Sequence, residues 1–317
     1  MSALLPAGPQ AAHVAALWDV MLVVTGIVFV AIVAATIVAV ARARRGAADA
    51  PSDAAGATAG EQRSHRIIWA AVLASTVLLA GLVVASAVTD RALASLPTDG
   101  ALRITLTAHQ WWWEATYEDG GVHDRFTTAN ELHIPVGRPV LFTLAASDVI
   151  HSLWVPELAG KKDLIPGRVA PHAWRADRAG TYRGVCAEFC GYQHAHMALL
   201  VIAEAPDAYA AWAERQRQPA AEPADDAAKR GRDVFLTSTC AMCHAVDGTT
   251  AQAQRAPNLT HVASRRTIAA GTLANSPANR AAWIADPQAI KPGANMPPHA
   301  LRPEDARALF AFVDTLQ

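Results

Sequence analysis

Two long uncharged stretches dominate the hydrophobic pattern near the start of the chain. Val20–Ala41 is 22 residues without a charge, and Ile67–Thr89 is 23. About 20 apolar residues are enough for a helix to cross a lipid bilayer. A buried core helix is the alternative, but core helices are seldom so long or apolar on every side. The pattern therefore predicts two transmembrane helices, at about residues 18–41 and 67–89.

Positive charges between the two stretches set the expected orientation. Residues 1–16 contain no Lys or Arg, whereas the connecting segment carries Arg42, Arg44, Arg45, Arg63 and Arg66. Because positively charged loops stay in the cytoplasm, we expect a helical hairpin with both ends, and everything after Asp90, outside the cytoplasm. A cleaved signal peptide is the alternative for the first stretch, although the basic segment that begins such signals is missing.

Shorter segments of alternating character follow between residues 100 and 204. "LRITLTAHQWWWEATY" is rich in Thr, Trp and Tyr, and "ELHIPVGRPVLFTLAAS" reads as two strands around a Gly-Arg-Pro turn. "GTYRGVC" and "MALLVIAE" are two further strand candidates. Such residues favour pleated, half-buried strands. Several short strands separated by turns are typical of a β-sandwich or barrel.

The last third of the chain has a helical pattern instead. "PDAYAAWAERQRQ" is helical in character, and "PAAEPADDAA" after it is expected to be a flexible linker. Ser276 followed by Pro277 predicts the start of a helix. A further helix is expected near the end, with an apolar stripe made of Leu309, Phe312, Val313 and Leu316.

The expected architecture is a multidomain membrane protein with four segments. Residues 1–95 hold the N-terminal segment and the helical hairpin, 96–205 the β-domain, 206–224 the helix and linker, and 225–317 a small all-α domain. The formal net charge of −1 gives no case for a nucleic-acid partner. Membrane lipid is an expected partner of the hairpin.

Four cysteines occur, in two tight pairs. In an oxidising compartment the simplest interpretation is two disulfides. The first pair, Cys186 and Cys190, lies in "CAEFCGYQHAHM", which gathers two thiols, two imidazoles and a thioether in one short loop. Copper and zinc prefer donors of these kinds, so a metal site competes with the disulfide.

Two thiolates four residues apart can bridge two soft metal ions. His194 can complete the coordination of one ion, with Met197 as a weak axial donor. His151, in "SDVIHSLWVPE", can complete the coordination of the other. Because no ligand position stays open, such a site favours electron transfer over catalysis. A mononuclear zinc or copper-chaperone site is the remaining alternative, although copper chaperones of this spacing have helices that residues 100–204 lack.

These residues resemble a known family. The loop matches the CuA loop of cytochrome c oxidase subunit II, and "SDVIHSLWVPELAGKKDLIPGR" and "HQWWWEATY" match other segments of that family. The resemblance covers about residues 15–205 and implies a cupredoxin-like β-barrel with a binuclear copper centre, CuA. The metal ligands that it implies are His151, Cys186, Glu188 through its backbone carbonyl, Cys190, His194 and Met197.

The resemblance also bears on the neighbours of these ligands. His196 falls where the family has no ligand, so His194 is expected to bind copper and His196 is not. The side chain of Glu188 is expected to reach a magnesium ion shared with subunit I. The match of "HQW" makes Trp111 the residue through which electrons enter CuA. Trp111, Trp112 and Trp113 are expected to share a strand, so that Trp112 faces opposite its two neighbours, and at least one tryptophan is expected in the barrel core.

The second cysteine pair lies in "CAMCH", the attachment motif of a c-type haem. Cys240 and Cys243 are expected to bind the haem covalently, and His244 is expected to ligate its iron. "IKPGANMPP" offers Met296 as the second axial ligand, and Met/His ligation suits electron transfer. The rivals for that position are His261 and His299. A thioredoxin-like redox motif is the alternative for the cysteines, but it leaves the histidine of the motif without a role.

This segment resembles a class I cytochrome c domain, and the chain as a whole resembles subunit II of caa-type haem–copper oxidases. The resemblance implies that one haem c receives electrons from an external donor, either a soluble cytochrome or an upstream complex. The electrons then pass to CuA and to subunit I, where dioxygen is reduced to water in a proton-translocating complex of the respiratory chain. The expected location is the bacterial inner membrane, with two spans and with the copper and haem domains on the extracytoplasmic side.

Two other classes of function stay open on the sequence alone. One is a membrane-anchored electron carrier that serves another terminal reductase, and the other is a copper-delivery or assembly protein. The apolar stretches contain no histidine between residues 20–41 or 67–89. We therefore expect no dioxygen site in this chain, and oxidase activity is expected of the whole complex with subunit I and other oxidase subunits.

Overall fold

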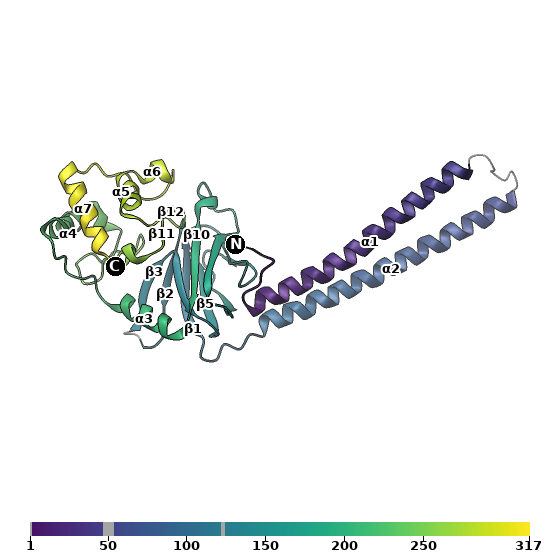
Figure 1. Ribbon diagram of the computed structural model, residues 1–317, viewed down its shortest axis with the longest axis horizontal. Coiled ribbons are helices and arrows are strands. Elements are labelled where there is room, and N and C mark those ends of the chain that lie inside the picture. Colours follow the sequence, from purple (N-terminus) through teal and green to yellow (C-terminus); the bar gives the residue numbers. More distant parts are fainter. Residues whose placement is uncertain (1, 47–53, 122–123) are drawn as a thin grey trace. The chain divides into compact units, whose positions relative to one another are not determined.

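The computed structural model describes residues 2–46, 54–121 and 124–317. The chain divides into two compact units. The smaller unit is Ala12–Ser95, and the larger one consists mainly of Leu96–Gln317. Figure 1 labels the elements of both.

Two long helices dominate the smaller unit. α1 spans Pro9–Gly46 and α2 spans Ala54–Ala94 (Figure 1). Each helix is long and apolar enough to cross a membrane, and its apolar window is not buried inside the protein. Large side chains such as Phe29 and Trp69 are 68% and 70% exposed. Apolar helices that are exposed all round need a lipid environment.

Both helices extend further than the uncharged stretches that predicted them. The predicted ranges, 18–41 and 67–89, lie inside α1 and α2. Ala and Arg are good helix formers, and they continue the helical turns on both sides. The arginines of the connecting segment therefore lie on helix ends: Arg42, Arg44 and Arg45 in α1, and Arg63 and Arg66 in α2. Residues 47–53, the middle of that segment, lie outside the described residues.

Two five-stranded sheets form the β-domain. The strand orders are β3-β2-β1-β5-β8 and β4-β10-β9-β6-β7. β1 pairs with β5 and β10 pairs with β4 in parallel, and the other neighbours are antiparallel. The strands are β1 Leu102–His109, β2 Trp112–Tyr117, β3 Phe126–Ala129, β4 Glu131–Pro135, β5 Val140–Ala146, β6 His151–Trp154, β7 Lys162–Leu164, β8 Ala170–Trp174, β9 Gly180–Cys186 and β10 Ala198–Glu204.

Alternation along the strands fills the core of this domain. In β1, Leu102, Ile104 and Leu106 are all buried, because every second side chain of a strand points to the same face. The Gly-Arg-Pro turn joins β4 to β5, and Gly137 in it has a φ of 79°, which residues other than glycine rarely adopt. β4 and β5 lie in different sheets, so this turn crosses between the layers instead of closing a hairpin.

The three adjacent tryptophans occupy three different environments. Trp113 is fully buried, which confirms that at least one tryptophan belongs to the core. Trp112 opens β2 and stacks on His109, with ring centroids 4.2 Å apart. Trp111 precedes the strand. The predicted alternation of all three on one strand is therefore wrong, because only Trp112 and Trp113 share it.

Helices and short turns form the C-terminal part. They are α3 Pro206–Arg217, α4 Asp226–Thr237, η3 Thr239–Met242, η4 Val262–Ser264, α5 Pro277–Ala285, α6 Pro287–Ile290 and α7 Pro303–Thr315. The only strands in this part, which is fully described, are two of two residues each, β11 Thr267–Ile268 and β12 Leu273–Ala274. As predicted, Ser276 caps α5, and its Oγ accepts a hydrogen bond from Asn279 N at 3.2 Å.

A second hydrophobic core holds the C-terminal part together. The predicted stripe on α7 is buried in it, and Phe312 packs against Phe235 of α4 with ring centroids 5.8 Å apart. The linker is anchored to this part, because Ala220 N donates a hydrogen bond to Asp247 O at 2.9 Å and Pro223 is buried. The flexibility of the linker stays a prediction, but two of its residues contact the C-terminal part.

Candidate metal centre and haem cavity

The predicted metal ligands come from two adjacent strands and the loop that follows one of them. His151 is the first residue of β6, and Cys186 is the last residue of β9. The two strands are antiparallel neighbours, with Leu153 opposite Cys186, so both ligands reach the same end of the sheet. The loop from Cys190 to Met197 leads back to β10, and a hydrogen bond from Cys186 N to Met197 O (3.0 Å) closes it.

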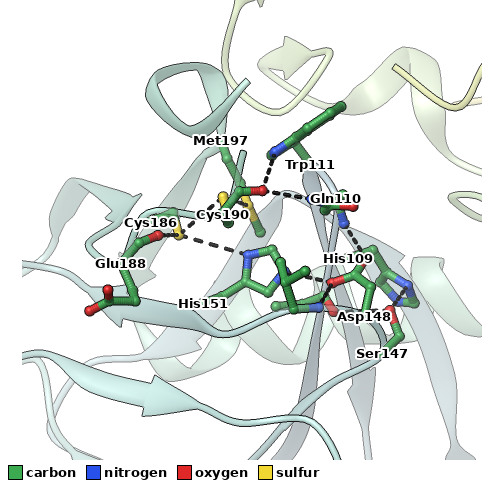
Figure 2. Close-up of polar contacts among 12 residues, drawn as sticks. His109, Gln110, Trp111, Ser147, Asp148, His151, Cys186, Glu188, Cys190 and Met197 are labelled. Atoms are coloured by element: carbon green, nitrogen blue, oxygen red, sulfur yellow. Dashed lines mark hydrogen bonds and ion pairs between the residues drawn. The ribbon is translucent and has the colours of Figure 1, made fainter. Parts of the chain in front are cut away.

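The five side chains predicted to bind metal converge at this end, and Figure 2 shows four of them. Cys186 Sγ and Cys190 Sγ are 3.8 Å apart, and His151 Nδ1 lies 3.8 Å from Cys186 Sγ. His194 Nδ1 lies 3.6 Å and Met197 Sδ 3.9 Å from Cys190 Sγ. Each sulfur therefore has its own imidazole, which is the two-ended donor set that a pair of thiolate-bridged ions needs.

The two cysteines do not form a disulfide in this structure. The separation of their sulfurs, 3.8 Å, far exceeds the disulfide bond length of about 2.05 Å. A hydrogen bond from Cys190, helped by His151, lowers the pKa of Cys186 well below its ordinary value. The pKa of Cys190 is raised, because its thiol makes that hydrogen bond and because burial disfavours a second charge. The lowered pKa favours the thiolate of Cys186, which is the form that binds metal.

Asp148 is a residue of this site that the sequence reasoning missed. One of its carboxylate oxygens lies 2.8 Å from His151 Nε2, and the other accepts a hydrogen bond from Gln110 N at 2.6 Å (Figure 2). Burial lowers the pKa of His151, but hydrogen bonds with Cys186 and Asp148 outweigh burial and raise the pKa. A carboxylate on the far nitrogen orients a metal-binding histidine. Its position three residues before His151 is the signal that could have revealed it.

Glu188 presents different groups on two sides of the loop. Its carbonyl oxygen lies 3.2 Å from Cys186 Sγ. Figure 2 shows the carboxylate of Glu188 pointing away from the two sulfurs. The backbone and the side chain can therefore meet different partners.

His196 lies outside the cluster of sulfur and imidazole donors. It belongs to the short turn η2, His194–His196, and its side chain is exposed. His196 Nδ1 lies 2.8 Å from Gln193 Oε1. The loop is therefore not extended at this point, and a hydrogen bond within the turn holds His196 apart from the ligands.

The haem motif begins with the turn η3, which carries Cys240 and is followed by Cys243. His244 Nδ1 donates a hydrogen bond to Pro257 O at 2.7 Å. This bond fixes the proton on Nδ1 and leaves Nε2 as the lone-pair donor for a metal. Burial lowers the pKa of His244 and so favours the neutral, ligating form.

A cavity of about 520 Å³ lies beside this motif. Cys240, Cys243, His244 and Met296 all line it. Its apolar lining includes Leu259, Val262, Ile268, Trp283, Ile284 and Val313. Two thiols, an imidazole and a thioether around one apolar cavity fit a covalently bound haem with two axial ligands.

The two histidines that rival Met296 differ in their surroundings. His261 is buried, and both its ring nitrogens contact backbone oxygens, Gln317 O at 2.7 Å and Gln218 O at 3.1 Å. It is therefore unsuited to bind iron. His299 lines the cavity, with its Nδ1 3.3 Å from Thr239 Oγ1. His299 stays a rival to Met296.

Trp111 contacts both sites. It lines the cavity beside the haem motif, and its Nε1 donates a hydrogen bond to Cys190 O at 2.9 Å (Figure 2). The side chain of Gln110 donates a second hydrogen bond to the same oxygen at 2.7 Å. One indole thus extends from the cavity wall to the backbone of a predicted metal ligand.

Two family models match the chain. Residues 119–204 match the family described as cytochrome c oxidase subunit II, periplasmic domain, and residues 228–317 match the family described as cytochrome c. The first range contains the metal cluster and the second contains the haem motif. A subunit II domain implies copper of the CuA type, and a cytochrome c domain implies haem.

Individual subunit II proteins are also similar to this chain in sequence. The cytochrome c oxidase subunit 2 of Alkalihalophilus pseudofirmus is 37% identical over 100% of this chain and 91% of its own length. Subunit 2 from Bacillus sp. strain PS3 is 35% identical over 74% of this chain and 68% of its own length. Among solved structures, the periplasmic domain of subunit II of cytochrome oxidase from Bradyrhizobium japonicum is 28% identical, covers 37% of this chain and 93% of that chain, and has a TM-score of 0.35.

The predicted fold class is confirmed. Two apolar helices come first, a cupredoxin-like β-domain follows, and a cytochrome c domain ends the chain. The match to the Alkalihalophilus protein extends over all of these parts. The chain therefore belongs to the cytochrome c oxidase subunit II family, in the form that carries a C-terminal cytochrome c domain.

Proposed function

We propose that this chain carries electrons into a caa-type oxidase through two redox centres of its own. It accepts them at a haem c in the C-terminal domain, passes them to a binuclear CuA centre in the β-domain and delivers them to subunit I for the reduction of dioxygen to water. When bound, the haem and the copper pair would each supply one-electron redox chemistry.

The residues of the β-domain would hold the copper pair. The thiolates of Cys186 and Cys190, the imidazoles of His151 and His194, the thioether of Met197 and the backbone carbonyl of Glu188 would hold it. Asp148 holds the ring of His151 in place, because its carboxylate binds the nitrogen that faces away from the sulfurs. Both sulfurs are buried, at 5% and 3% exposure, which keeps water away from the ions.

The residues of the C-terminal domain would hold the haem. Cys240 and Cys243 would bind it covalently, and His244 and Met296 would ligate its iron. The hydrogen bond from His244 to Pro257 O orients the imidazole, and the apolar lining of the cavity excludes water. A thioether opposite a histidine raises the haem potential, as suits a donor to copper.

The position of Trp111 carries the proposal. This residue lines the cavity and also donates a hydrogen bond to the backbone of Cys190. Trp111 therefore offers a short covalent and hydrogen-bonded path between the two sites. A copper-delivery protein has no use for a tryptophan held between a haem cavity and a metal ligand.

The proposal also covers the orientation of the chain in the membrane and its partner proteins. The arginines near the ends of α1 and α2 keep that side in the cytoplasm, so the copper and haem domains lie outside the bacterial inner membrane, with α1 and α2 in lipid. Subunit I receives the electrons, and the carboxylate of Glu188 binds a magnesium ion at the contact with subunit I. The external donor, a soluble cytochrome or an upstream complex, delivers its electrons to the haem domain.

Metal analysis and spectroscopy of the purified full-length chain test this proposal. The expected content is two coppers and one covalent haem per chain, with an electron-spin-resonance signal of one electron shared by both coppers. A single exchangeable copper per chain would favour a copper-delivery protein and contradict the proposal.

A further inference from the structure

A buried lysine joins the C-terminal domain to the β-domain. Lys291 is only 3% exposed, although lysine is almost never fully buried without a partner for its charge. Its ammonium donates hydrogen bonds to Trp111 O at 2.7 Å and to Ala269 O at 3.3 Å. The first oxygen belongs to the β-domain and the second to the C-terminal domain, so a single side chain binds both.

Trp111 extends this contact to the copper loop. Its indole Nε1 donates to Cys190 O at 2.9 Å (Figure 2), while its own carbonyl accepts from Lys291. The next residue adds a second contact, because Pro292 O accepts a hydrogen bond from Gln193 Nε2 at 2.7 Å. Gln193 is 4% exposed and lies in the loop of metal ligands. Lys291 thus contacts Trp111, and the next residue, Pro292, contacts the copper loop through Gln193.

The same segment leads directly to Met296. Gln288 fixes its conformation, because Gln288 Oε1 accepts from Gly293 N at 2.8 Å and Gln288 Nε2 donates to Ala294 O and Met296 O, both at 2.7 Å. Gly293 has a φ of 82°, and a Cβ added there would lie 3.9 Å from the ring of Trp111. The docking contacts and the proposed axial ligand therefore belong to one ordered segment.

We propose that Lys291 is a positioning residue for electron transfer from the haem to the copper pair, because its ammonium fixes the backbone of Trp111 to the segment that carries Met296. The inference rests on the proposed function of the chain. Lys291 also lines the haem cavity, but it is not one of the proposed ligands and acts through Trp111. Without this bond, the carbonyl of Trp111 loses its hydrogen-bond donor and the buried Lys291 loses its acceptor. The two domains then no longer favour the arrangement in which the indole reaches both sites.

Chemical acetylation of the intact, copper- and haem-loaded chain tests the contact without any substitution. The chain has four lysines, and the other three, Lys161, Lys162 and Lys229, are exposed internal controls. If the contact did not form, Lys291 would be exposed and would react about as fast as the controls. We expect it to react at least about tenfold more slowly, because it reacts only when the contact opens. Reaction as fast as that of Lys161 would overturn the inference.

Lys291→Met tests the role in electron transfer, with Lys161→Met as the matched control. We expect faster amide exchange at Ala198, whose N–H donates to Ala270 O across the two domains at 3.0 Å. We also expect the first-order rate of haem-to-copper transfer after flash reduction to fall about tenfold, because the fraction of docked chains sets that rate. Lys291→Arg keeps the charge and several donors and should retain most of the rate. Lys161→Met should change neither quantity.

The possible failures are distinguishable. If Lys291→Met transfers electrons as fast as the native chain and its amide exchange is unchanged, the role of Lys291 is overturned and the proposed function stands. If the native chain itself transfers no electron from haem to copper, the proposed function fails and the role of Lys291 falls with it. The acetylation experiment needs no variant, so a Lys291→Met chain that does not fold still leaves the contact testable.

Discussion

The copper site and the haem cavity differ in how much of the molecule each one needs. Every proposed copper ligand lies between His151 and Met197, on two neighbouring strands and one loop of the β-domain. The haem cavity takes its donors from the C-terminal domain, but Trp111 and Trp112 of the β-domain also line it. The copper site is therefore a property of one domain, whereas the surroundings of the haem depend on both.

This difference has a physical cause. Two metal ions are small enough for a single loop to surround, and paired strands hold the ends of that loop at fixed positions. A haem is a large apolar group that needs an extended cavity, and an edge of it that faces another domain can be covered by that domain. Substitutions of the copper ligands should therefore change only the copper site. Substitutions around the haem cavity should also change the rate of electron transfer between the two sites.

The largest expected effect is the loss of the copper signal when a ligand is removed. His194→Ala should abolish the mixed-valence copper spectrum, because His194 Nδ1 faces Cys190 Sγ at 3.6 Å. His196→Ala is the matched control and should keep the spectrum, because that side chain is exposed and bonds to Gln193. The haem absorption should be unchanged in both variants. Loss of copper from the His196 variant with retention in the His194 variant would contradict the assignment.

Met296→Leu should have the next largest effect, and on the haem alone. Leucine cannot ligate iron, so the haem potential should fall by a sizeable part of the ~0.8 V over which axial ligands set haem potentials. Redox titration of the haem band measures the change, and the copper spectrum should stay the same. Met242→Leu is the control, because Met242 lies inside the motif and is 68% exposed. A lowered potential in the control and a normal one in Met296→Leu would point to a different axial ligand.

Asp148→Asn should weaken the copper site without removing a ligand. Loss of the carboxylate on the far side of a metal-binding histidine typically reduces metal affinity by about 10–100-fold. Competition with a copper chelator measures this affinity. Asp163→Asn is the matched control, since Asp163 is an exposed residue of β7, next to the strand of His151. Equal copper affinity in both variants would show that Asp148 does not support His151.

The smallest expected effect is a loss of stability in acid, which should occur in the β-domain and not in the C-terminal domain. Burial and, to a lesser degree, Lys162 lower the pKa of His172 in β8 to about 4. In the unfolded chain histidine titrates near 6.5, so the unfolded state binds more protons between these values. Stability should therefore fall as the pH drops from about 6.5 to 4, by at most about 3 kcal/mol. His172→Gln should flatten this loss.

Tryptophan fluorescence during chemical unfolding at several pH values measures the acid effect in the β-domain. The haem band reports the C-terminal domain in the same samples and should not follow the titration of His172. An identical pH dependence in the native chain and in His172→Gln would show that the buried histidine does not control the acid stability of the β-domain.

The sequence predicted those features that depend on local spacing. The cysteine and histidine spacing of the copper loop, the haem motif and the apolar stripe of α7 are all readable within a few residues. The order of apolar, alternating and helical segments indicated a helical hairpin, a β-domain and an all-α domain, and the family resemblance identified the β-domain as cupredoxin-like and the last domain as a cytochrome c. The assignment of β4 and β5 to different sheets was not predictable, because it depends on pairing between strands far apart in the chain.

Contacts between distant segments account for what the sequence did not predict. Asp148 is close to His151 in the sequence, but only the fold directs its carboxylate to the ring. The burial of Lys291 depends on a carbonyl 180 positions away, and no local pattern encodes it. The linker composition predicted flexibility but not the backbone hydrogen bond to Asp247.

This chain is proposed to pass electrons from its own haem to its own copper pair. Flash reduction of the haem in the intact oxidase measures this transfer directly. The haem and copper absorption bands are followed together at several protein concentrations. The haem should be reoxidised as the copper is reduced, with a single first-order rate that does not depend on the protein concentration. A haem that stays reduced while the copper accepts electrons from an external donor, or a rate that rises with protein concentration, would contradict this proposal.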